Sequence, residues 1–225
     1  MDRISIKQRA KKQIEGKIFQ LLAIYLVVIA ASWIISLVFG LIGGIINLII
    51  GGPIAYAMAS IYLGIIKKSR SPEVEDIIIG FKDNKFTRNL VAYLRYQVFI
   101  FLWTLLFIIP GIIKAISYSQ MFYLLAENDK LEASDAQRKS MEMMEGHKAE
   151  YFVLQLSFIP WFLLCIITFG IAAIYVTPYY EATMAEFHVR LVKENQPAAK
   201  AAKAIKAVAS KAAKTTKSVK AKAKK

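Results

Sequence analysis

Long apolar runs separated by short basic segments constrain this chain more than any other feature. Residues 18–39 contain no charged side chain. Further apolar runs follow at residues 45–66, 90–109, 112–126, 151–169 and 171–192. A helix needs about 20 residues to cross the hydrocarbon core of a bilayer. Only 20% of the 225 residues are charged, below the roughly 25% of soluble domains. The sequence therefore predicts an all-α membrane protein.

The first run resembles a secretory signal, but it has 22 residues where a cleavable apolar core has about 7–15. We interpret it as the first of about six transmembrane helices, arranged as three helical hairpins with short amphipathic helices at the interface. The hairpins cover approximately residues 18–66, 90–126 and 151–192. Gly16, Gly80 and Gly146 each precede a hairpin with similar spacing, which indicates an internal repeat. Four or five crossings remain the alternative, because residues 112–126 form a short span.

Lysine and arginine are distributed in a way that predicts the topology. The expected tight turns around residues 43–44, 110–111 and 170 contain almost no charge. Residues 1–17 and 67–89 each contain six basic side chains, and residues 127–150 contain four. Basic loops stay on the cytoplasmic side. Six crossings place every basic segment there, so we expect a multi-pass cell-membrane protein with both termini cytoplasmic.

The domain organisation follows from a change in composition near residue 197. Residues 1–196 form the expected membrane domain. Residues 197–225 form a tail of alanine and lysine, with ten lysines and no acid. We expect this tail to be disordered and to bind the anionic inner leaflet, where each lysine contributes about 1 kcal/mol. Nucleic acid is the less favoured partner. The candidate lipid contacts are Lys200, Lys203, Lys206, Lys211, Lys214, Lys217 and Lys220.

Three short motifs resemble a known family. They are the stretch 101–119 with Pro110-Gly111-Ile112-Ile113-Lys114 at its centre, the triplet Gly146-His147-Lys148, and Thr177-Pro178-Tyr179. Together they are similar to a bacterial integral-membrane family catalogued as domain of unknown function 975. The resemblance covers roughly residues 3–192 and implies a polytopic membrane protein with no assigned activity. The alanine-lysine tail lies outside the usual pattern of the family.

The chain contains none of the common sequence signatures of catalysis. It has no nucleophile elbow, zinc-protease motif, phosphate loop or dinucleotide fingerprint. Cys165 is the single cysteine, and His147 and His188 are the two histidines. A protein with so few ligating side chains offers little for a metal centre. We therefore expect no enzyme activity, no cofactor and no metal.

Three polar side chains within the apolar runs form the candidate site. Arg95, Gln155 and Glu181 fall at similar depths if the runs are transmembrane helices. Intramembrane charges are costly and commonly functional, so these residues are a candidate intramembrane polar layer in which Arg95 and Glu181 pair. The alternative is that Pro178 ends its helix early and that Glu181 lies at the membrane surface.

Two classes of function remain open. The favoured one is a non-enzymatic membrane scaffold or accessory subunit that acts through helix and lipid contacts, with a membrane-protein partner or a second copy of the chain. The alternative is a small transporter or channel-like carrier. It would use the Arg95 and Glu181 layer and a helix broken at Gly51-Gly52-Pro53.

Overall fold

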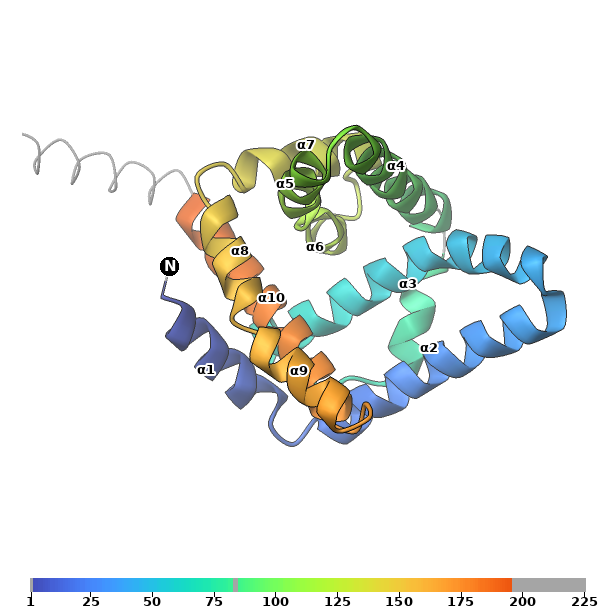
Figure 1. Cartoon of the computed structure of the whole chain (residues 1–225), viewed down its shortest axis with the longest axis horizontal. Helices are drawn as coiled ribbons and strands as arrows, with labels where there is room; N and C mark the ends of the chain where they lie inside the picture. Colours follow the sequence, from blue (N-terminus) through green and yellow to red (C-terminus); the bar gives the residue numbers. More distant parts are fainter. Residues whose placement is uncertain (1, 83–84, 196–225) are drawn as a thin grey trace, which may run out of the picture. The chain divides into compact units, whose positions relative to one another are not determined.

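The computed structural model describes residues 2–82 and 85–195, and these residues contain helices and no strand. The chain divides into two units, Met1–Val189 and Arg190–Lys225. The contacts discussed below belong to the first unit, and of the second only residues 190–195 are described. The elements, shown in Figure 1, are α1 (Arg3–Ile14), α2 (Ile18–Phe39), α3 (Leu41–Lys68), η1 (Val74–Gly80), α4 (Lys85–Leu106), α5 (Ile108–Tyr118), α6 (Met121–Glu127), α7 (Ala133–Met143), α8 (Lys148–Leu156), α9 (Ile159–Ile167) and α10 (Ala173–Asn195).

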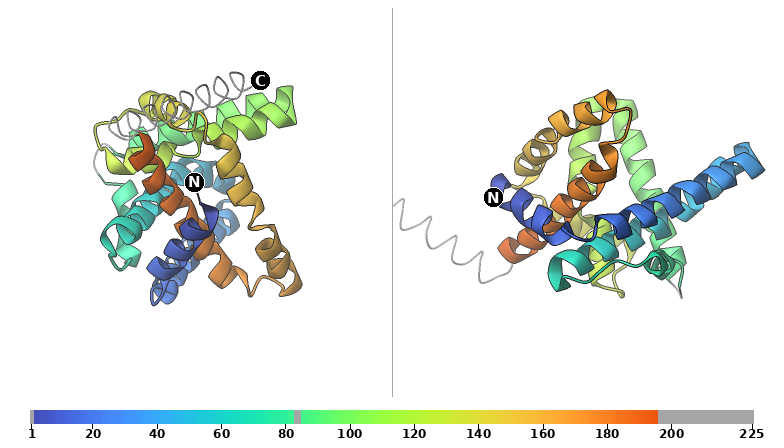
Figure 2. Two further views of the ribbon diagram at one scale, coloured as in Figure 1. Left: turned by 90° about the vertical axis from the view of Figure 1, so that its left-hand side faces the viewer. Right: turned by 90° about the horizontal axis from the view of Figure 1, so that it is seen from below.

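Helices α2 and α3 pack against each other after a one-residue turn. Gly40 makes this turn with a φ of 54°, a conformation that favours glycine. The expected turn at Gly43 and Gly44 therefore lies three residues earlier. Gly43 instead brings the two backbones together, since a β-carbon there would lie 2.6 Å from the Ile35 carbonyl oxygen. Figure 2, in its right-hand view, shows this end of the pair projecting away from the other helices of the unit.

Helix α3 is continuous through Pro53, so the break at Gly51-Gly52-Pro53 that the carrier alternative would use is absent. The glycines serve packing. A β-carbon on Gly52 would lie 2.4 Å from the carbonyl oxygen of Asn89 in α4. A β-carbon on Gly80, at the end of η1, would come even closer to the backbone carbonyl oxygen of Pro53. The Asn89 amide donates to the Gly80 carbonyl oxygen at 3.3 Å. This segment is a junction of three helices.

Helices α4 and α5 turn at Phe107, and not at Pro110-Gly111 as expected. Phe107 is extended (φ −157°), and α5 already begins at Ile108. Pro110 lies in the first turn of α5, where its missing N–H costs no helical hydrogen bond. Gly111 allows close packing, because a β-carbon there would meet the Thr104 hydroxyl of α4 at 2.4 Å. The earlier start lengthens the fourth apolar segment to Ile108–Glu127, 20 residues across α5 and α6.

Five helical segments of the described chain are long and apolar enough to cross a membrane. They are Ile18–Phe39, Leu41–Lys68, Lys85–Leu106, Ile108–Glu127 and Lys148–Ile167. The sixth expected run, which forms α10, is not among them, since it contains several ionisable side chains. Apolar residues are exposed near the ends of these segments; Leu41 and Phe169 are 97% and 98% exposed. Such surfaces suit lipid contact.

The polar segments between the apolar runs form short helices. The 3-10 helix η1 begins after Glu73, and the side chains of Glu73 and Asp76 form its capping box. Helix α7 begins at Ala133, after Glu132 in the N-cap position. Gly16 and Gly146 have φ values of 78° and 80°, which lets the chain turn before α2 and α8.

Candidate functional site

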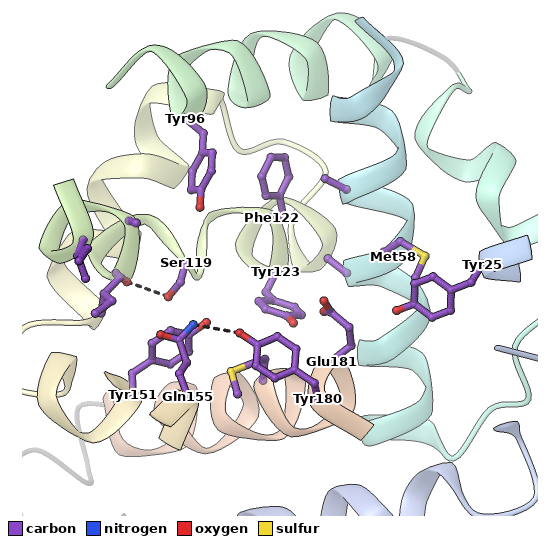
Figure 3. A pocket seen from close by; sticks show the side chains of 16 residues that line it. Tyr25, Met58, Tyr96, Ser119, Phe122, Tyr123, Tyr151, Gln155, Tyr180 and Glu181 are labelled. Atoms are coloured by element: carbon purple, nitrogen blue, oxygen red, sulfur yellow. Dashed lines mark hydrogen bonds between the residues drawn. The ribbon is translucent and has the colours of Figure 1, made fainter. Parts of the chain in front are cut away.

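A cavity of about 520 Å³ lies among the helices of the first unit. Figure 3 shows how side chains from α2, α3, α4, α6, α8 and α10 surround it. The lining residues are Tyr25, Ala55, Met58, Ala59, Tyr96, Ile112, Ala115, Ile116, Ser119, Phe122, Tyr123, Tyr151, Gln155, Tyr180, Glu181 and Met184. Ligand pockets commonly enclose about 300–1,000 Å³, so this cavity has room for a small molecule.

Aromatic side chains form a large part of the wall. Five tyrosines and Phe122 face the space from five different helices or helix segments. Tyr96, Tyr123, Tyr151 and Tyr180 lie near the ends of apolar runs in the sequence, and all four line the cavity. The sequence gives no signal for this role, because a tyrosine at a helix end looks the same whether it faces lipid or the interior.

Polar side chains of the wall form hydrogen bonds with each other and, in the case of Tyr25, with Tyr62 outside the lining. The amide nitrogen of Gln155 donates to the Tyr180 hydroxyl at 3.0 Å. The hydroxyls of Tyr25 and Tyr62 lie 3.0 Å apart and share a second hydrogen bond. Some hydrogen-bonding capacity of the wall is therefore already used by the protein itself.

Glu181 is the one acidic side chain that lines the cavity. It follows Pro178 within α10, which is continuous there, and Figure 3 shows its carboxylate pointing into the cavity beside Tyr123. Within the described part of the chain it makes no hydrogen bond or ion pair. The titratable groups within electrostatic reach are the phenols of Tyr25, Tyr62, Tyr123, Tyr151 and Tyr180.

Arg95 occupies a different place from the one expected for a layer with Glu181. Its guanidinium donates two hydrogen bonds to the Gln137 side-chain oxygen, at 2.9 and 3.2 Å, and lies over the ring of Phe99. It does not line the cavity. The structure thus brings Gln155 and Glu181 to one cavity and gives Arg95 a partner on α7. The expected Arg95–Glu181 pair is absent from the contacts of the described residues.

A buried polar cluster lies directly behind the cavity wall. His188 is fully buried, and its ring stacks on Tyr123 with centroids 5.0 Å apart. Its Nδ1 lies 3.0 Å from the Gln120 side-chain oxygen. Its Nε2 lies 3.1 Å from the Glu127 carboxylate, although the geometry is not that of a directed hydrogen bond. Glu127 also pairs with Lys67. His188 is therefore an interior side chain of the first unit.

A second cluster fixes the loop between α6 and α7. Asp129 lies 2.9 Å from the Lys85 ammonium nitrogen and accepts a hydrogen bond from the Tyr56 hydroxyl at 3.0 Å. Arg88 donates to the backbone oxygen of Asp129. The hydrogen bond from Lys85 is the main cause that lowers the pKa of the Asp129 carboxyl below its usual value.

The structure contains no obvious metal centre: within residues 2–82 and 85–195, no three His, Cys, Asp or Glu side chains are grouped so that they could hold a metal ion. Cys165 is a free thiol on α9. The seven candidate lysines of the tail, residues 200–220, lie outside the described residues.

A comparison of the sequence with protein-family models identifies the family of this chain. The family model described as "Protein of unknown function (DUF975)" matches residues 1–117 and 105–195. The comparisons with curated proteins and with solved structures gave no match. The matched segments cover every helix of the described residues, including the cavity and the motifs around Pro110 and Gly146. The chain belongs to the DUF975 family of proteins of unknown function.

Proposed function

We propose that this protein is a multi-pass membrane protein that binds a small molecule in its inter-helix cavity, in the manner of a carrier. The single observation that carries the proposal is the 520 Å³ cavity with the carboxylate of Glu181 in its wall. A lone carboxylate in a largely apolar wall is costly, and so is space that protein atoms do not fill. A bound ligand offsets both costs.

The other class of function, a scaffold or accessory subunit, has weaker support. A scaffold acts through its outer faces, so its stability favours a filled interior. The apolar outer faces of α2 and α9 suit any membrane protein and do not distinguish the two classes. The carrier proposal no longer depends on a broken helix or on Arg95. It depends on the cavity and on Glu181.

The finer topology belongs to the same proposal. We infer six crossings in three hairpins, with both termini in the cytoplasm. Two observations support α10 as the sixth segment. Aromatic contacts join α8 and α9 to α10, such as Tyr151 with Phe187 and Trp161 with Tyr179. Arg9, on the basic helix α1, lies 3.3 Å from the Glu186 carboxylate of α10. A sixth crossing also returns the basic tail to the side of the basic N-terminus.

A binding screen with a cavity-filled variant tests the proposal. Ala115 lines the cavity, so Ala115→Phe should fill much of it. Ala30 is exposed on α2, and Ala30→Phe is the matched control. The screen uses a mixed panel of cationic, neutral and anionic organic solutes and measures the melting temperature of the purified protein. We expect some of these solutes to raise the melting temperature of the wild type and of Ala30→Phe, but not that of Ala115→Phe. If no solute of any charge separates Ala115→Phe from its control, the proposal is wrong.

A further inference from the structure

We propose that the cavity binds a monovalent organic cation with an apolar body, such as a substituted ammonium, and that Glu181 is its counter-ion. This inference rests on the proposed function and specifies its ligand class. Four observations support it: the charge of the wall, the aromatic faces, the engagement of nearby basic side chains, and the lack of a metal-ligand set.

Among the described residues, the wall has one formal charge, and that charge is negative. Glu181 is the acidic residue of this lining, which includes no described lysine, arginine or histidine. An anionic ligand would therefore meet a carboxylate and no compensating cation. A cationic ligand would neutralise Glu181 where water is scarce and the attraction between opposite charges is strong.

The aromatic wall suits the same ligand. The rings of Tyr, Phe and Trp attract cations to their faces, an interaction that recognises substituted ammonium groups in aromatic cages. Five tyrosines and Phe122 surround the space next to Glu181. Met58 and Met184 add flexible apolar contact. An ammonium group with an apolar body matches both parts of this wall.

Basic side chains of the surrounding helices have partners elsewhere. Arg95 binds Gln137, Lys67 pairs with Glu127, and Lys114 lies over the Trp103 ring at 5.0 Å. Each of these side chains has an interaction outside the cavity, and no described basic side chain lines the cavity beside Glu181. This leaves the carboxylate available to a cation from solution.

The chemistry of the wall argues against a metal ion and against a polyhydroxy ligand. A hard metal ion takes six or more oxygen ligands, several of them carboxylates or carbonyls, whereas this wall offers one carboxylate. A sugar-like ligand needs many free hydrogen-bonding groups. Gln155 and Tyr180 bond to each other, and Tyr25 bonds to Tyr62, so part of that capacity is already occupied.

Three probes of one shape and different charge test the inference. They are choline, its neutral isostere 3,3-dimethylbutan-1-ol, and the anion 3,3-dimethylbutanoate. Binding to the purified full chain in lipid nanodiscs is measured by saturation-transfer NMR and by melting temperature. We expect choline to bind at least about tenfold more tightly than the alcohol, with no binding of the anion.

Matched variants assign the effect to the cavity. Glu181→Gln should weaken choline binding by about tenfold or more and leave the alcohol unchanged. Glu75→Gln is the control, because Glu75 is exposed on η1. Tyr96→Phe keeps an aromatic face and should keep choline binding, whereas Tyr96→Leu should weaken it. If Glu181→Gln does not fold, the comparison of Tyr96→Phe with Tyr96→Leu still tests whether choline binds against the aromatic wall of the cavity.

The outcomes separate this inference from the function on which it rests. Equal or tighter binding of the alcohol or the anion, or choline binding that survives both Glu181→Gln and Tyr96→Leu, would overturn the cation inference. A cavity that binds other solutes in the screen with Ala115→Phe would still stand as a binding site. No binding by any of the three probes also overturns the cation inference, and the solute screen alone then decides the proposed function.

Discussion

Individual glycines determine how closely the helices of this protein approach. Gly52 and Gly80 lie where any side chain would enter the backbone of another helix, whereas Gly44 has nothing within 4 Å of its missing β-carbon. The sequence shows these glycines as equivalent interruptions of apolar runs. Their different roles follow only from the neighbours that packing brings to them.

Substitution at Gly52 should therefore be far more costly than at Gly44. A β-carbon at position 52 would lie 2.4 Å from the Asn89 carbonyl oxygen, so α3 and α4 must move apart. Overpacking of this kind costs about 1–3 kcal/mol. We expect Gly52→Ala to lower the melting temperature in detergent and Gly44→Ala to leave it within error. Equal effects of the two substitutions would contradict the junction described for α3, α4 and η1.

The Asp129 cluster predicts a loss of stability in acid. The folded state lowers the pKa of this carboxyl, so the charged form contributes stability above the usual pKa of about 3.9. That contribution disappears as the pH falls through the lowered folded value. Asp129→Asn should be less stable than wild type near pH 6, and the difference should shrink below about pH 4. Glu75→Gln, at an exposed position of η1, is the control. A difference that stays constant with pH would exclude this account.

At the scale of elements, the turns lie where close contact between helices requires them. The α4–α5 pair turns at Phe107 because Gly111 packs onto Thr104. From the sequence, Pro110 and Gly111 suggest a turn. In the structure, both residues lie within the first turn of α5. A proline is compatible with either place, so the sequence alone does not separate a turn from a helix start.

A double-mutant cycle tests the contact between α4 and α5. Gly111→Ala should destabilise the protein, since its β-carbon would lie 2.4 Å from the Thr104 hydroxyl oxygen. Thr104→Ala removes that oxygen, so the double variant should recover part of the loss. We would measure melting temperatures of the four proteins in one detergent. Strict additivity would show that positions 104 and 111 are not in contact.

At the scale of the whole molecule, the arrangement of apolar segments predicts its membrane topology. In a Cys165→Ser background, cysteines replacing Lys68 and Glu132 should react with an impermeant thiol reagent only from the cytoplasmic side. A cysteine replacing Gly44 should react only from the outside, and position 44 tolerates a side chain. Labelling of the cysteine at position 132 from the outside would contradict six crossings with cytoplasmic termini.

The sequence by itself determined the class of the protein. Charge-free runs of about 20 residues are compatible with few environments other than a bilayer, and the motifs around Pro110 and Gly146 sufficed to identify the family. Helix positions followed within a few residues, because apolar periodicity and capping are local properties.

Only the tertiary structure decided the site. Glu181 and Gln155 are marked by their polarity within apolar runs, and they do line one cavity. The partner of Arg95, the burial of His188 and the gathering of five tyrosines around Glu181 depend on which faces of distant helices meet. The sequence of one helix specifies its polar and apolar residues. The face that another helix covers depends on packing between segments as far as 177 residues apart, as in the contact of Arg9 with the Glu186 carboxylate.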